Sequence, residues 1–249
     1  MAFFKDKPSL IAASLTPDET YDAPLPPAKS VLGRLARTYN ALGGLMDILA
    51  DQTGIDPVAV LAVWYVESGG RGFTAGHPII RFENHKFFQF WGHDHAGQFD
   101  QHFQFGGHAG VPGKSSTNHK FRAETTAAFA TFHGDQTKEY EVFNFAGALA
   151  NREEACLSIS MGGPQIMGFN ADACGYPSAS AMFDAFAQDP RWHVLGFFDF
   201  VQSKGLIEQI ADEDWVSFGA HYNGDGATYG PLLEDAFSNK AKLKALPKS

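Results

Sequence analysis

The sequence predicts a mainly α-helical (α+β) fold, built as one domain with a small β element. Most of the chain consists of apolar segments at helical spacing, bounded by capping residues. Only residues 71–120 break this pattern, because glycines, histidines and aromatic residues crowd together there. With 249 residues, 44% of them hydrophobic and 14% aromatic, the chain can bury one sizeable core, and general disorder is excluded.

Prolines, caps and apolar spacing set the order of the elements. Residues 1–30 carry five prolines and little periodicity, so we expect an extended N-terminal arm before a main domain at 31–249. In that domain, apolar spacing and capping residues predict helices over residues 31–52, 56–68, 137–150, 151–159, 180–187, 189–205, 213–222 and 231–246. The loop-rich segment 71–120 remains for the β element.

The second of these helices ends in an acidic residue, Glu67. Asp56 can cap its first free N–H groups and Pro57 fits its first turn, after which Val58 to Val66 leave almost no polar face. Burial and the negative end of the helix dipole both disfavour a charged carboxylate, so we expect a raised pKa for Glu67. A carboxyl group that stays protonated near neutral pH suits a general acid in glycoside cleavage. The alternative is an ordinary solvated glutamate at a helix end.

Three further segments contain specific sequence motifs. They are Pro78-Ile-Ile-Arg-Phe-Glu83-Asn-His-Lys-Phe-Phe88, Ser158-Ile-Ser-Met-Gly-Gly-Pro-Gln165-Ile-Met-Gly-Phe-Asn170 and Asp214-Trp-Val-Ser-Phe-Gly-Ala-His-Tyr222-Asn-Gly224. Together with the helix that carries Glu67, they resemble the N-acetylmuramidase domain of phage endolysins and related bacterial lysins, a branch of the lysozyme-like superfamily. The resemblance spans roughly Leu35 to Leu243. The chain departs from the family pattern at Met161, where Trp is usual, and at Gly163-Pro164, which bears on the cleft wall and substrate preference.

The resemblance implies a single lysozyme-like catalytic domain at 31–249, with a small β-hairpin or flap lining its cleft. It implies a muramidase that hydrolyses the β-1,4 bond between N-acetylmuramic acid and N-acetylglucosamine in peptidoglycan, with Glu67 as general acid. A lytic transglycosylase would use the same glutamate and leave an anhydro sugar. A wall-binding protein that had lost catalysis would keep the fold. Both alternatives stay open.

Glycoside hydrolysis usually requires a second carboxylate, and Glu83 in the flap is the best candidate. Glu83 could equally hold the flap by pairing with Arg81, His85 or a backbone amide, and the sequence favours neither role. The family pattern and the chemistry of amide, hydroxyl and backbone groups point to further substrate-binding residues. These are Ser160, Gln165, the backbone around Ile166, Tyr222 and Asn223.

No cofactor is implied, and no residue is assigned as a metal ligand. Histidines crowd the segment between His77 and His119, so a metal-dependent wall amidase or peptidase is an alternative function. The chain lacks a His-Glu-x-x-His motif and the spacing fits no specific template. A structural or adventitious metal site therefore remains open beside the glycosidase.

Charge and composition limit the classes of partner that the protein can bind. A net charge of −9 argues against non-specific nucleic-acid binding and gives no support for docking on an anionic membrane. No apolar run approaches the ~20 residues that span a bilayer. We expect a monomer that acts on peptidoglycan glycan strands. It would be made in the cytoplasm without a signal peptide and delivered to the periplasm or cell wall by a holin or a secretion system. Neither an inhibitor nor an immunity partner can be deduced.

The chain contains two cysteines, Cys156 and Cys174, which flank the Gln-Ile-Met-Gly-Phe-Asn block. They could form a bridge once in the periplasm. For a chain made in a reducing compartment, two buried free thiols are the favoured expectation.

Overall fold

A computed structural model describes residues 2–249 of the chain. Helices dominate it, as the sequence predicts. The α-helices are α1 (Pro8–Ala12), α2 (Val31–Thr53), α3 (Pro57–Ser68), α4 (Asn84–Phe90), α5 (Ala96–His102), α6 (Gln136–Leu149), α7 (Arg152–Leu157), α8 (Ala179–Gln188), α9 (Pro190–Ser203), α10 (Ile207–Ala211), α11 (Trp215–Tyr222), α12 (Gly226–Phe237) and α13 (Lys240–Lys244). Short 3-10 helices are η1 (Phe4–Asp6), η2 (Gly92–His95) and η3 (Gly168–Asn170).

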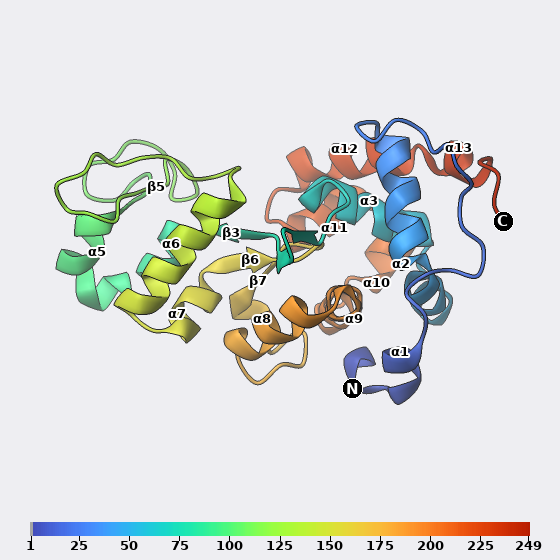
Figure 1. Cartoon of the computed structure of the whole chain (residues 1–249), viewed down its shortest axis with the longest axis horizontal. Helices are drawn as coiled ribbons and strands as arrows, with labels where there is room; N and C mark the ends of the chain where they lie inside the picture. The colour runs from blue at the N-terminus through green and yellow to red at the C-terminus, as the bar shows by residue number, and fades with distance from the viewer. Residues whose placement is uncertain (1) are drawn as a thin grey trace.

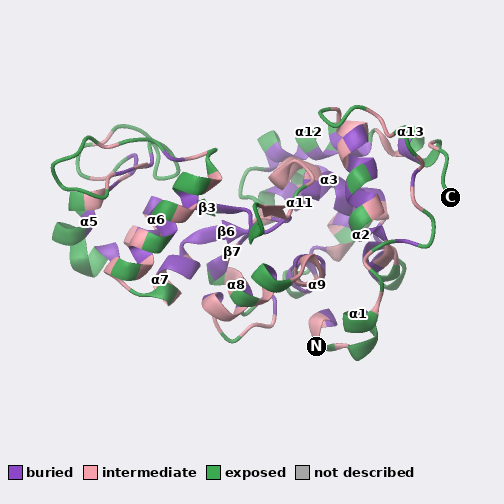
Figure 2. Ribbon diagram, viewed as in Figure 1, coloured by how far each residue is buried: buried purple, intermediate pink, exposed green. Residues whose placement is uncertain are grey.

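A small antiparallel sheet lies between two groups of helices (Figure 1). Helices α2, α3, α11, α12 and α13 lie at one end of the molecule, and α5, α6 and α7 at the other. The sheet has the strand order β3-β6-β7, and two further strand pairs are β1 with β2 and β4 with β5. The strands are β1 (Phe73–Thr74), β2 (His77–Pro78), β3 (Ile80–Phe82), β4 (Phe103–Gln104), β5 (Lys120–Phe121), β6 (Ile159–Met161) and β7 (Ile166–Met167). Figure 2 shows the sheet among the buried parts of the chain.

The register of the sheet brings two of the family-like segments together. Arg81 in β3 lies opposite Ser160 in β6, and Ser160 lies opposite Met167 in β7. Segments 78–88 and 158–170 are therefore neighbours although about 70 residues of chain separate them. The sheet supplies one wall of the cleft described below.

Helix α3 has the boundaries and burial that the sequence predicts. The side chain of Asp56 accepts a hydrogen bond from the N–H of Val58 at 2.8 Å, and Pro57 occupies the first turn. Residues 58–64 are all buried. The helix ends at Gly69, whose φ of 65° is left-handed, and its N–H donates to the carbonyl of Tyr65. This end leaves Glu67 in the last turn of the helix.

The segment 71–120 differs from the expected irregular flap. It contains helices α4 and α5 as well as short strands. Phe87, Phe99 and Phe103 pack on one another with ring centroids 5.1–6.1 Å apart, and all three are buried. This aromatic cluster gives both helices a face to bury, which a search for aliphatic periodicity does not detect.

Two other boundaries also differ from expectation. The helix expected to reach residue 159 ends at Leu157, because Ile159–Met161 pairs with β3 and forms a strand instead. The last expected helix, 231–246, is two helices, and α12 begins at Gly226, well before Pro231. The side chain of Asp225 caps α12 by accepting from the N–H of Thr228 at 3.0 Å, so the start lies at the acidic cap rather than at the proline.

The N-terminal arm is not extended throughout, because Phe4–Asp6 and Pro8–Ala12 are helical. Pro8 opens α1 at a position where its missing N–H costs nothing. Asp199 in α9 accepts hydrogen bonds from the backbone N–H groups of Phe4 and Lys5 and so holds the arm against the domain. In the part of the chain that the structure describes, no helix has both the length and the apolar character needed to cross a membrane.

Candidate active site

A cleft of about 390 Å³ opens where α3, the sheet and α11 meet. Six of the seven predicted site residues line it: Glu67, Glu83, Ser160, Gln165, Tyr222 and Asn223. The seventh, Ile166, is only 2% exposed and packs into the core from β7. Larger hollows of about 590 and 660 Å³ lie elsewhere on the surface, and neither is lined by two carboxyl groups. The smaller cleft is therefore the candidate site on chemical grounds.

Glu67 reaches the cleft from the last turn of α3, and its carboxyl group is largely enclosed by protein. The hydroxyl of Tyr229 donates a hydrogen bond of 2.6 Å to its Oε1. Burial raises the pKa of Glu67 to about 7, although hydrogen bonds from Tyr229 and Asn223 act in the opposite direction. A large fraction of Glu67 is therefore protonated at neutral pH. This is the ionisation state that a general acid needs before it donates its proton.

Tyr229 was not expected from the sequence, and the packing of α11 against α12 places it. Gly226, at the start of α12, allows this close approach, since a Cβ there would lie 2.1 Å from the carbonyl oxygen of Val216 in α11. Tyr229 lies one turn further along α12, with its ring centroid 6.1 Å from that of Tyr222. The buried Tyr229 and the half-buried Tyr222 thus lie side by side, and the hydroxyl of Tyr229 orients the carboxyl group of Glu67.

Glu83 stands at the junction of β3 and α4, on the sheet side of the cleft. Its backbone N–H donates to the carbonyl of Ser158 at 2.8 Å. The Nε of Arg81 donates to its Oε1 at 2.7 Å, while Nδ1 of His85 and Nδ1 of His119 lie 3.4 and 3.3 Å from its Oε2. The contacts expected for a structural role therefore exist, in the same cleft as Glu67.

These contacts set the ionisation of Glu83. Burial alone would raise its pKa, but the neighbouring His85, the positive charge of Arg81 and the electrostatic effect of His119 outweigh burial and lower the pKa to about 2. Glu83 is thus ionised at neutral pH, where Glu67 is still partly protonated. Two carboxyl groups with pKa values so far apart can divide the roles of acid and anion.

Ser160 and Gln165 hold the hairpin between β6 and β7. The hydroxyl of Ser160 donates to Oε1 of Gln165 at 2.8 Å, and Nε2 of Gln165 donates to the carbonyls of Gly162 and Ile79 at 2.7 and 3.2 Å. Ser160 is in a strand, whereas the sequence suggested a helix end. The Gln165 amide keeps only acceptor capacity at Oε1 for a sugar, since both amide hydrogens are occupied.

Tyr222 and Asn223 close the cleft from the end of α11. The hydroxyl of Tyr222 donates to the carbonyl of Pro164 at 2.6 Å, so it ties α11 to the β6–β7 hairpin. Asn223 caps α11, and its side-chain amide helps to lower the pKa of Glu67.

Three further acidic residues, considered as weaker candidates for the second carboxylate, have other partners. Asp94 pairs with His93, Asp100 pairs with His108, and Asp225 caps α12. Cys156 and Cys174 are both buried free thiols, as expected. The family-like block around Tyr222 ends before Tyr229, so the sequence offered no signal for that residue except its position seven residues after Tyr222.

A family model of N-acetylmuramidase matches residues 56–239, about three quarters of the chain. The chain belongs to the N-acetylmuramidase family. Among solved structures, it is similar to the crystal structure of the Burkholderia AP3 phage endolysin, with 26% sequence identity and a TM-score of 0.59 over 80% of this chain and 70% of that chain. None of the curated proteins compared with the chain matches it.

Family membership confirms the resemblance drawn from the sequence and the mainly α (α+β) endolysin-like fold. As a member of this family, the protein is a glycoside hydrolase that degrades peptidoglycan of the cell wall.

Proposed function

We propose that this protein hydrolyses the β-1,4 bond between N-acetylmuramic acid and N-acetylglucosamine, with Glu67 as the general acid. The observation that carries the proposal is the pair Glu67 and Glu83, which line one cleft with pKa values of about 7 and about 2. The bond assignment rests on the family match and on the likeness to a phage endolysin.

In the proposed reaction, protonated Glu67 donates to the glycosidic oxygen as the bond to the leaving sugar breaks. The Tyr229 hydroxyl, 2.6 Å from Oε1, stabilises the carboxylate that forms. Ionised Glu83 lies in the same cleft and stabilises the oxocarbenium-like centre or takes a proton from the attacking water. Asn223 and the free acceptor positions of Gln165 would bind hydroxyl or N-acetyl groups.

The test is digestion of purified peptidoglycan by the parent protein and by Glu67→Gln, followed by borohydride reduction and mass spectrometry. Reducible muramic acid ends that require Glu67 support a hydrolytic muramidase. Glu234→Gln, at an exposed position of α12, is the matched control and should behave as the parent. Anhydro-muramic ends would show that the protein is a lytic transglycosylase and not a hydrolase. Released peptides with intact glycan would reject both and favour a wall amidase or peptidase.

Delivery to the wall is part of the proposal and rests on the likeness to a phage endolysin. We propose release through a holin, with export by a secretion system as the second route. Expression in a bacterium with and without a co-expressed holin tests this. Lysis that needs the holin supports holin-mediated release, and lysis without it would reject that route.

A further inference from the structure

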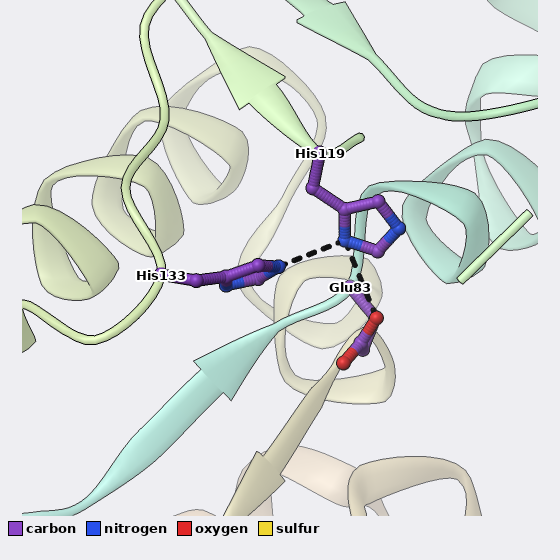
Figure 3. A group of neighbouring side chains, drawn as sticks. All are labelled: Glu83, His119 and His133. Carbon is purple, nitrogen blue, oxygen red and sulfur yellow. Dashed lines mark hydrogen bonds and ion pairs between the residues drawn. The ribbon is translucent and has the colours of Figure 1, made fainter. Parts of the chain in front are cut away.

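Three side chains from distant parts of the chain meet beside the cleft: Glu83, His119 and His133 (Figure 3). One potential ligand atom from each lies within 4.8 Å of the other two. Nε2 of His133 is 3.0 Å from Nδ1 of His119, and that Nδ1 is 3.3 Å from Oε2 of Glu83. The side chain of His119 is fully buried, and those of Glu83 and His133 are 13% and 22% exposed.

The outer partners of the two histidines fix which ring nitrogens carry hydrogen. Nε2 of His119 lies 2.9 Å from the carbonyl oxygen of Ser115, and Nδ1 of His133 lies 2.9 Å from Oε1 of Glu139. A carbonyl and a carboxylate only accept hydrogen bonds, so each of those nitrogens is the protonated one in a neutral ring. The facing nitrogens, Nδ1 of His119 and Nε2 of His133, then both present lone pairs.

Two lone pairs that face each other at 3.0 Å repel unless a positive charge stands between them. Oε2 of Glu83 adds a third electron-rich atom at the same point, and this buried oxygen has no hydrogen-bond partner in the described structure. The arrangement of these three atoms therefore suits a cation. An excess proton is one such cation, and a metal ion is the other.

The spacing and the outer contacts favour the metal. A tetrahedral zinc ion with bonds of about 2.0–2.1 Å separates its ligand atoms by about 3.3 Å. Two of the three separations, 3.0 and 3.3 Å, are close to this value, and the third lies within 4.8 Å. Histidines that bind metals usually donate their other ring N–H to a carbonyl or carboxylate, as His119 and His133 do here.

We propose that Glu83, His119 and His133 form a binding site for a divalent transition-metal ion of the zinc class. The ligand atoms are Oε2, Nδ1 and Nε2, in that order. The fourth position goes to water or to His85, whose Nδ1 lies 3.4 Å from the same Glu83 oxygen and has no hydrogen-bond partner among residues 2–249. The ion would join the start of α4, where Glu83 lies, to the segments before β5 and α6. It would thereby hold these three parts of the chain together.

The site would also link metal occupancy to the cleft, because Glu83 contributes to both. With an ion on Oε2, only Oε1 of Glu83 remains, and Arg81 holds that oxygen. This second point rests on the proposed function, whereas metal binding itself does not. The experiment therefore measures binding directly rather than activity.

The experiment titrates ZnCl₂ into chelator-treated full-length protein without a histidine tag, followed by calorimetry and elemental analysis. We expect one ion per chain for the parent and for His93→Ala, whose side chain is exposed and lies outside the site. His133→Ala should bind at least about tenfold more weakly, a lower limit taken from the effect of outer contacts on metal affinity. At a hundredfold excess of free zinc over Kd, the parent Tm should rise by roughly 5–10 °C.

Cobalt provides a readout that needs no variant. Co²⁺ bound to the parent should give the intense visible absorption of a tetrahedral nitrogen and oxygen site, and zinc should displace it. Weak octahedral absorption, no uptake of zinc by the parent, or uptake by His133→Ala equal to that of the parent would each overturn the proposal. Circular dichroism shows whether His133→Ala is folded. If it is not folded, the cobalt spectrum of the parent alone tests the proposal.

Discussion

Replacement of Glu67 by Gln should make the protein more stable at neutral and alkaline pH while removing its activity. The folded protein raises the pKa of this carboxyl group from an ordinary value near 4.5 to about 7. The unfolded chain therefore releases this proton at lower pH than the folded chain does. Stability is lost as pH rises from about 4.5 to about 7, and the full cost persists above pH 7.

The size of the effect follows from the same values. Each unit of pKa corresponds to ~1.4 kcal/mol, so the cost in the parent approaches about 3 kcal/mol above pH 7. This figure is an upper bound, because the side chain keeps some contact with solvent. The glutamine side chain of the variant does not titrate and can still accept the hydrogen bond from Tyr229. The variant should thus gain up to about 3 kcal/mol, or roughly 6–12 °C in Tm for a chain of this size.

Urea denaturation of the parent and of Glu67→Gln at pH 5, 6, 7 and 8 provides the assay. The difference in unfolding free energy should be small at pH 5 and should grow to its full value by pH 8. Glu234→Gln, the exposed control, should show no such trend. A difference that is constant with pH, or a variant that is less stable at pH 8, would refute the view that burial holds Glu67 protonated. In the same samples, kcat on peptidoglycan should fall at least about a hundredfold.

Three further predictions follow from the same contacts. Tyr229→Phe removes the hydrogen bond that stabilises ionised Glu67, so the alkaline limb of the kcat/KM profile should move up by about one pH unit. An unchanged limb would show that Tyr229 does not influence the pKa of the catalytic acid. Glu83→Gln, in metal-free protein, removes a group whose lowered pKa stabilises the fold above about pH 4.5. The free energy of unfolding of the variant should therefore fall by up to about 3 kcal/mol at pH 7. Urea titrations should show that this deficit closes as pH falls toward 2. Cys156 and Cys174 should react with a thiol reagent only after unfolding, because burial shields both and raises the pKa of each thiol; rapid labelling of native protein would contradict this.

Local signals along the chain were sufficient for several features. Helix α3 with its Asp56 cap and the apolar run that becomes buried follow from residues within one segment. Capping and apolar spacing also placed α2, α8 and α9 close to their observed bounds. Six of the seven candidate residues that the family-like motifs indicated line one cleft. The helices depend on interactions between neighbours in sequence, which a periodic pattern reports directly.

Other features depended on contacts between distant residues. Ile159–Met161 is a strand because β3 lies beside it, and no local pattern contains that partner. The lowered pKa of Glu83 reflects Arg81, His85 and His119 together, and only the fold brings His119 to it across 36 positions of sequence. His133 was not among the histidines first considered as ligands, since it lies beyond the histidine-rich segment.

The sequence by itself determined the class of fold, the family and the identity of the candidate acid, because each is encoded in a short run of residues and its spacing. The tertiary structure alone decided which groups surround that acid and its partner. Tyr229 reaches Glu67 from 162 positions away, and Glu83 meets two histidines from two separate loops. The pKa of a carboxyl group depends on every charge, dipole and apolar surface within a few ångströms, so it is set only when distant segments pack together.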